Sequence, residues 1–119
     1  MLSVYWFKCG KAPNVDWCSL ENLNLETVTE SGVYVIWHQG NPGSVVYIGQ
    51  GNPISGRLSS HRNDRRILAY KAKGLRVTWA SVPVAQRDGV ERCLADTWRP
   101  LVGDAHPDAR PIEVNSPFG

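Results

Sequence analysis

Residues 32–49 read GVYVIWHQGNPGSVVYIG, and this stretch decides the fold. Residues 32–38 and 44–49 are rich in Val, Ile, Tyr and Trp, the residue types that favour strands. The GNPGS between them contains the Pro and Gly that mark a turn. The stretch therefore predicts a β-hairpin, and each strand carries a tyrosine in a glycine-containing motif, Tyr34 in GVY and Tyr47 in YIG.

The register of this hairpin determines whether its two tyrosines share a site. A loop centred on Gly40-Asn41, with residues 38 and 43 paired, puts the tyrosines opposite each other on one face. A two-residue Pro42-Gly43 loop would instead separate them by four positions, about 13 Å at the usual rise per residue. A Pro-Gly pair suits a type II turn, which fits two-residue hairpins poorly, so we expect the wider loop.

Two helical segments follow the hairpin. Pro53 is a good first residue for a helix that runs through ISGRLSSH and ends near residues 62–63, because its missing N–H has no partner at that position anyway. Residues 64–73 predict a second helical stretch, with Asp64 as N-cap and Gly74 as the stop.

A third strand and a last helix complete the pattern. LRVTWASV, residues 75–82, alternates like a strand and is ended by Pro83. Val90, Leu94 and Trp98 have the i, i+4, i+8 spacing of an amphipathic helix, which ends at Pro100.

These elements predict a small α+β fold, an α/β sandwich with a central three-stranded antiparallel sheet flanked by helices. Residues 1–30 are expected to form an N-terminal extension packed on the domain, with a candidate strand over residues 3–8. Residues 31–119 form the domain and its extended, proline-containing C-terminal tail. The 119 residues are the length of a single domain.

Composition indicates a folded, soluble protein. The chain is 42% hydrophobic and 20% charged, and no apolar run approaches the roughly 18 residues that span a bilayer. No signal-peptide pattern opens the sequence, so we expect a cytoplasmic protein that does not associate with membranes. Cys9, Cys18 and Cys93 lack metal-binding spacing and are expected to be reduced thiols.

The basic residues are concentrated in one segment although the net charge is only +2. Residues 57–76 contain one acid, Asp64, and seven bases: Arg57, Arg62, Arg65, Arg66, Lys71, Lys73 and Arg76. Such a patch is typical of proteins that bind nucleic acid, because Lys and Arg neutralise phosphates. A solvated helix face is the alternative on charge alone.

The order of motifs resembles a known family. GVY at 32–34, YIG at 47–49, Arg57 followed by His61, and Glu91 in a late helix are similar to the GIY-YIG nuclease domain. The resemblance covers about residues 31–104. It implies a metal-dependent endonuclease that hydrolyses phosphodiester bonds, DNA more than RNA, and leaves 5′-phosphate and 3′-hydroxyl ends.

The resemblance also implies roles for the tyrosines. Tyr34 is the general base that takes a proton from the attacking water, and Tyr47 is its hydrogen-bonding partner or a phosphate ligand. A phenol has an ordinary pKa of about 10, so we expect Arg57 and a divalent metal to favour the phenolate. His61 would pass or accept the proton. Without these neighbours, tyrosines in strands would be read as ordinary pleat residues.

Arg57 and His61 are four residues apart, so both side chains project from one face of a helix. Arg57 offers a fork of donors that matches phosphate oxygens and is expected to stabilise the transition state. An exposed helix arginine and a helix-end capping histidine are the alternatives.

Glu91 is the expected metal ligand, at the edge of the buried face of the last helix. A single carboxylate with waters and substrate oxygens is enough for Mg²⁺, and Mn²⁺ is the alternative ion. The competing interpretation is a surface Glu paired with Arg87 or Arg92. An asparagine that the family often has after the final proline is missing here, and Asn115 in VNSPFG is either its substitute or a structural turn residue.

Two other hypotheses keep the fold. The domain could be an inactive nucleic-acid-binding module, or a nuclease toxin or effector in a defence or competition system. The six bases from Arg62 to Arg76 are the candidate nucleic-acid track, with Tyr70 beside it and Trp79 expected in the core. Because a single small domain has little surface for sequence readout, target choice is expected to depend on structure, short motifs, a homo-oligomer or a protein partner.

Overall fold

A four-stranded antiparallel sheet in the order β1-β4-β2-β3 is the centre of the computed structural model, which describes residues 1–103 and 105–118. The strands are β1 (Cys18–Ser19), β2 (Gly32–His38), β3 (Ser44–Gly51) and β4 (Leu75–Ser81). The hairpin β2–β3 and strand β4 are the three strands expected from the sequence, and the α+β prediction is confirmed. The two-residue β1 is an additional edge strand, contributed by the N-terminal segment.

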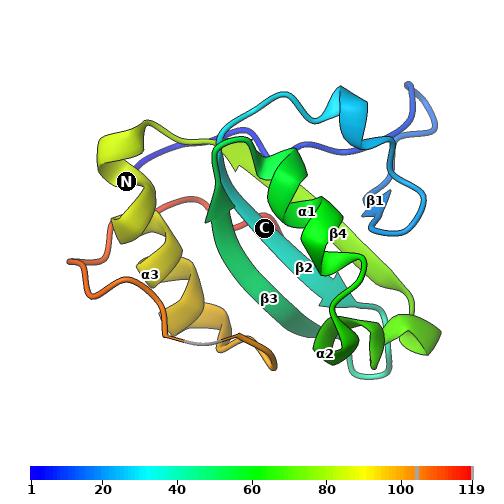
Figure 1. Ribbon diagram of the computed structural model, residues 1–119. Coiled ribbons are helices and arrows are strands. Elements are labelled where there is room, and N and C mark those ends of the chain that lie inside the picture. Colours follow the sequence, from blue (N-terminus) through cyan, green and yellow to red (C-terminus); the bar gives the residue numbers. More distant parts are fainter. Residues whose placement is uncertain (104, 119) are drawn as a thin grey trace.

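Helices α1 (Ile54–His61) and α3 (Arg87–Trp98) lie on opposite faces of this sheet (Figure 1). In α1 the buried residues Ile54 and Leu58 are four positions apart, so one side of the helix packs on the sheet. In α3 the apolar positions Val90 and Leu94 are buried in the same way. The protein therefore has three layers, helix, sheet and helix, with a core on each side of the sheet.

The second helix is shorter than the one predicted over residues 64–73. Asp64 caps α2 (Arg65–Leu68) by accepting a hydrogen bond from the Arg66 N–H, as expected. The helix then ends, and a 3₁₀ turn at Lys71–Lys73 follows. Tyr70 leaves the helical conformation and its ring stacks on His38, at 5.4 Å between centroids, while the chain turns back toward β4.

Strand β2 supplies residues to both cores, which explains its unbroken apolar sequence: all seven of its residues are buried. Tyr34 and Ile36 belong to the core on the α1 side, and Val33 and Val35 to the core on the α3 side. A central strand covered on both faces has no polar face to show in its sequence.

The hairpin has neither of the two registers considered from the sequence. His38 pairs with Ser44 at the turn, but a bulge then shifts the register so that Ile36 pairs with Tyr47. Without the bulge Tyr34 would lie opposite Ile48, and Tyr47 would point to the other face. With it, Tyr34 lies opposite Gly49, so the two tyrosines are diagonal neighbours on the α1 face.

The N-terminal segment crosses the sheet without forming the strand expected at residues 3–8. Its contacts at this point are isolated: Leu2 bridges to Val114, and the Phe7 N–H donates to the Trp79 carbonyl. Between them the backbone of Val4 bonds to a side chain, that of Asn115, and a side chain cannot extend a strand ladder.

The prediction of three reduced thiols is wrong for two of them. Cys9 and Cys18 form a disulfide, and Cys93 is free. A bridge between Cys9 and Asp16 folds the loop between the cysteines back on itself, and pairing of Cys18 with β4 holds the other end. The N-terminal segment is thus fastened to the domain. None of the helices in the described parts of the chain has the length and apolar character needed to cross a membrane.

Candidate active site

The centre of the candidate site is the hydroxyl of Tyr34, which extends from β2 across the neighbouring strand at Gly49. Tyr34 is fully buried. A Cβ atom at position 49 would lie 2.7 Å from Cζ of Tyr34 and closer still to its hydroxyl oxygen. The glycine of the YIG motif therefore provides the space that the phenol occupies.

His61, the last residue of α1, contacts this hydroxyl. Its Nε2 lies 2.6 Å from the Tyr34 oxygen, and its ring lies 4.3 Å from that of Tyr47 between centroids. The two tyrosine rings are parallel within 7°, with centroids 6.1 Å apart. The bulge in β3 and the end of α1 together bring the three rings into one cluster.

Arg57 joins the cluster from the preceding turn of α1. Its Nε lies 3.5 Å from the hydroxyl of Tyr34, and its Nη2 lies 3.3 Å from that of Tyr47. Arg57 and His61 thus reach Tyr34 from the same helix face, as their spacing predicts. Arg57 itself is exposed, so its guanidinium borders solvent above the buried phenol.

Burial raises the pKa of Tyr34 above its ordinary value of 10.0. The hydrogen bond and charge of Arg57 oppose this effect but do not outweigh it, and the charges of Tyr47 and Glu91 add to the rise. Arg57 thus favours the phenolate, as expected, but its effect on the pKa of Tyr34 is smaller than that of burial. At neutral pH Tyr34 is a protonated phenol.

Burial also lowers the pKa of His61 from 6.5 to about 4, with the positive charge of Arg57 as the next cause. His61 is therefore neutral at pH 7. Because the Arg57 Nε–H donates to the Tyr34 oxygen, the phenol proton is available to His61 Nε2. The three groups form a chain of hydrogen bonds from Arg57 through Tyr34 to His61.

Glu91 approaches the site from the other layer, on α3. It is 7% exposed, and its charge is felt at Tyr34. Gln50 Nε2 donates to its Oε1 at 3.1 Å, and His106 Nδ1 lies 2.9 Å from its Oε2. The alternative ion pairs do not form: Arg87 donates to the Val82 carbonyl, and Arg92 pairs with Asp96.

The surroundings of Glu91 fit a divalent cation held by one carboxylate. An ionised carboxylate has about four lone-pair positions, and the contacts with Gln50 and His106 use one on each oxygen. Among residues 1–103 and 105–118, no group of three or more His, Cys, Asp or Glu side chains is arranged to bind a metal. Mg²⁺ does not need such a group, because water and substrate oxygens complete its coordination.

Asn115 does not join these residues. Its side-chain oxygen accepts from the Val4 N–H at 2.7 Å, and its amide nitrogen donates to the Val4 carbonyl at 3.0 Å. Its own carbonyl accepts from Trp6 Nε1. Asn115 therefore joins the tail to the N-terminal segment, and the structural alternative for this residue is the correct one.

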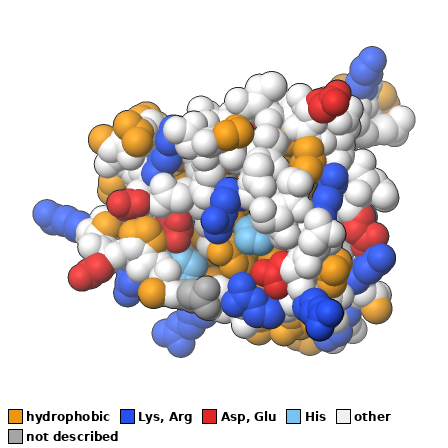
Figure 2. All heavy atoms as spheres, viewed as in Figure 1, with side chains coloured by type: hydrophobic (Ala, Val, Ile, Leu, Met, Phe, Trp, Pro, Cys, Tyr) orange, Lys and Arg blue, Asp and Glu red, His pale blue; other side chains and the backbone are white. Residues whose placement is uncertain are grey.

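The six bases of the expected track are only partly available. Arg62 donates to the carbonyls of Leu20 and Leu23, and Arg76 donates to that of Trp17, so both fasten the N-terminal segment. Lys71 and Arg66 form ion pairs, with Glu21 and Asp64 respectively. Arg65 and Lys73 are exposed. Figure 2 shows this mixture of Lys, Arg and acidic side chains on the lower right of the face.

The two aromatic residues near the track pack against the core, Trp79 as a buried residue and Tyr70 as a partly buried one. Trp79 stacks on Phe7 and donates to Glu30, which confirms its expected place in the core. Tyr70 stacks on His38. Both rings therefore already have an aromatic stacking partner within the protein.

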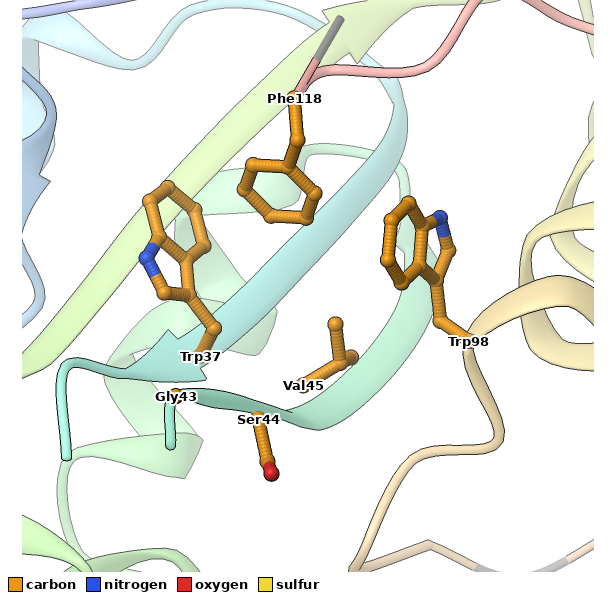
Figure 3. A pocket seen from close by; sticks show the side chains of 6 residues that line it. All are labelled: Trp37, Gly43, Ser44, Val45, Trp98 and Phe118. Carbon is orange, nitrogen blue, oxygen red and sulfur yellow. The ribbon is translucent and has the colours of Figure 1, made fainter. Parts of the chain in front are cut away.

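An apolar pocket of about 230 Å³ lies at the turn end of the hairpin (Figure 3). The rings of Trp37, Trp98 and Phe118 surround it, and the Ser44 hydroxyl points away from them. Because its lining contains no acid, base or cation, this pocket offers nothing for hydrolysis.

Two residues of the site were missed from the sequence, Gln50 and His106. Gln50 directly follows the YIG motif, so its position was a usable signal. His106 lies in the irregular tail, where no periodicity or motif connects it with Glu91.

Comparison of the chain with family models, with curated proteins and with solved structures gave no match. The resemblance to GIY-YIG nucleases therefore rests on the motifs and remains a prediction.

Proposed function

We propose that the protein is a metal-dependent endonuclease that hydrolyses phosphodiester bonds of nucleic acid, DNA in preference to RNA. The observation that carries the proposal is the chain of hydrogen bonds through Tyr34, in which a buried phenol contacts both a neutral His61 and a cationic Arg57. General acid–base groups beside a fixed positive charge are what phosphodiester hydrolysis requires.

Tyr34 and His61 act together as the base. The attacking water loses its proton to the Tyr34 oxygen while the Tyr34 proton moves to His61 Nε2, over the 2.6 Å that separates the two atoms. The hydroxide forms a bond to phosphorus, and the bond from phosphorus to the 3′ oxygen breaks. The products are a 5′-phosphate and a 3′-hydroxyl, because the leaving 3′ oxygen takes up a proton from solvent water.

Arg57 binds the phosphate. In the free protein its guanidinium bonds to the two phenol oxygens, at 3.5 and 3.3 Å, which are long contacts for these groups. A phosphate offers ionised oxygens and shorter, stronger bonds. Neutralising the charge of Arg57 also removes one cause of the low pKa of His61, so bound phosphate makes His61 a better base.

Glu91 would hold the Mg²⁺ ion. When bound, the ion supplies positive charge that polarises the phosphate and stabilises the leaving oxygen. The protein keeps this carboxylate buried beside β3, where its charge is felt at Tyr34.

The test uses purified wild type and Glu91→Ala with labelled single-stranded, duplex and branched DNA and with RNA, each with and without Mg²⁺. We expect Mg²⁺-dependent cleavage of at least one substrate by the wild type and none by the variant. No cleavage by the wild type in any reaction would reject the proposal.

One observation favours the non-catalytic binding module. Both oxygens of Glu91 already accept hydrogen bonds within the protein, so the carboxylate is stable without a metal. If nucleic acid binds without being cleaved and Glu91→Ala binds it equally well, this second function is the correct one.

The Cys9–Cys18 disulfide indicates the kind of compartment in which the protein acts. Disulfides persist mainly in oxidising compartments, so this one favours a site of action outside the reducing cytoplasm, in contrast to the sequence-based expectation. It also favours the effector hypothesis. Counting alkylated thiols in protein taken directly from its native cells distinguishes a disulfide from free Cys9 and Cys18.

A further inference from the structure

Two residues contact Glu91 without having a part in the proposed chemistry. Gln50 comes from β3 and His106 from the C-terminal tail, so they approach the carboxylate from separate parts of the chain. Glu91 is one of the few charged residues buried in the protein. A carboxylate at that depth is costly unless neighbours donate hydrogen bonds to it.

Each oxygen of the Glu91 carboxylate accepts one hydrogen bond. Gln50 donates to Oε1 and His106 to Oε2, with one donor on each oxygen. Gln50 is itself held, because the same Nε2 donates to Asp88 Oδ1 at 2.7 Å, one turn before Glu91 on α3. The amide therefore links β3 to two carboxylates of the helix.

We propose that Gln50 and His106 are positioning residues that fix the Glu91 carboxylate for a divalent cation. A glutamate side chain rotates about three bonds, and donors on both oxygens fix the plane of its carboxylate while leaving a lone pair on each oxygen. Partners of this kind orient metal ligands in proteins, and their loss costs about 10- to 100-fold in metal affinity or activity. This inference rests on the proposed function of Glu91.

The tail thereby becomes part of the site. His106 lies beyond the segment that resembles the nuclease family, yet its imidazole is half-buried against the proposed metal ligand. The competing explanation is that Gln50 and His106 only compensate for the burial of Glu91. In that case their loss would lower the stability of the fold and leave the affinity of the folded protein for metal unchanged.

The experiment measures Mn²⁺ binding by electron paramagnetic resonance and Mg²⁺ binding by calorimetry, on folded protein without nucleic acid. Its variants are His106→Leu, His106→Asn and Gln50→Leu, with Glu91→Ala as the ligand-free reference. His106→Asn keeps an N–H donor near the position of Nδ1. Asp108→Asn, at an exposed position of the same tail, is the matched control. Thermal unfolding of each variant reports on structure.

We expect Mn²⁺ affinity to fall about 10- to 100-fold in His106→Leu and Gln50→Leu, to stay within about threefold of wild type in His106→Asn, and to be unchanged in Asp108→Asn. Wild-type affinity in both leucine variants would overturn the inference and leave the proposed function standing. Absence of Glu91-dependent metal binding in the wild type would also overturn the inference, and the cleavage assay with Glu91→Ala decides separately on the proposed function.

Discussion

Replacing Gly49 with alanine tests the geometry on which the site depends. The added Cβ would lie 2.7 Å from Cζ of Tyr34 and 3.0 Å from Cε1 of Tyr47, whereas ordinary contacts are 3.4–4 Å. The phenol must therefore move by on the order of 1 Å. Such a movement lengthens the 2.6 Å contact with His61 beyond hydrogen-bonding distance.

Two effects follow in Gly49→Ala. Overpacking in a buried position costs about 1–3 kcal/mol of the free energy of unfolding. A displacement of about 1 Å in a catalytic group costs about 100-fold in rate. Both are measurable, the first by urea unfolding and the second by the rate of cleavage of the substrate found for the wild type.

Gly56→Ala is the matched control. Gly56 lies within α1, and an added Cβ would have no atom within 4 Å. The same substitution there is expected to raise stability by about 0.5–1 kcal/mol, because alanine favours a helix interior, and to leave the cleavage rate unchanged. A Gly49→Ala protein with wild-type stability and rate would refute the proposed packing of Tyr34.

Three further predictions concern charge and stability. His61 becomes protonated near pH 6.5 in the unfolded protein but only near pH 4 in the folded one. The free energy of unfolding should therefore decrease by at most about 3 kcal/mol as the pH falls from 6.5 to 4. Urea unfolding measures this decrease, which should be absent in His61→Gln. Arg65→Ala and Lys73→Ala should each lower the salt dependence of nucleic-acid binding by about one phosphate, whereas Arg62→Ala should lower the stability of the fold instead. If the plot of log affinity against log salt has the wild-type slope in all three variants, Arg65 and Lys73 are not part of the interface. Reducing the disulfide, which joins cysteines nine residues apart, should lower the free energy of unfolding by about 2–3 kcal/mol, and an unchanged melting temperature would contradict that.

Local sequence patterns were sufficient for most of the fold. The i, i+4 spacing in α1 and α3 reflects burial of one helix face, which the sequence shows directly. In β4 the alternation marks Leu75, Val77 and Trp79, which belong to the core on the α1 side, although Thr78 and Ala80 between and beyond them are buried as well. The shared direction of the Arg57 and His61 side chains follows from their i, i+4 spacing on α1, and both reach Tyr34.

Other features depend on contacts between distant parts of the chain. The bulge in β3 arises where Val46 and Tyr47 both turn to the α1 side, which depends on the packing available there. The pKa of Tyr34 is raised because the side chain is buried in the core, and the degree of burial cannot be read from the residue type. The tail residues His106 and Asn115 find their partners at sequence separations of 15 and 111 residues.

In the proposed reaction the Tyr34 hydroxyl moves the proton of the attacking water. The most direct test is the single-turnover cleavage rate of Tyr34→Phe at saturating Mg²⁺, which removes one oxygen atom and keeps the ring over Gly49. A drop of about 100-fold or more, with nucleic-acid binding retained, is the predicted result. A rate equal to that of the wild type would contradict it.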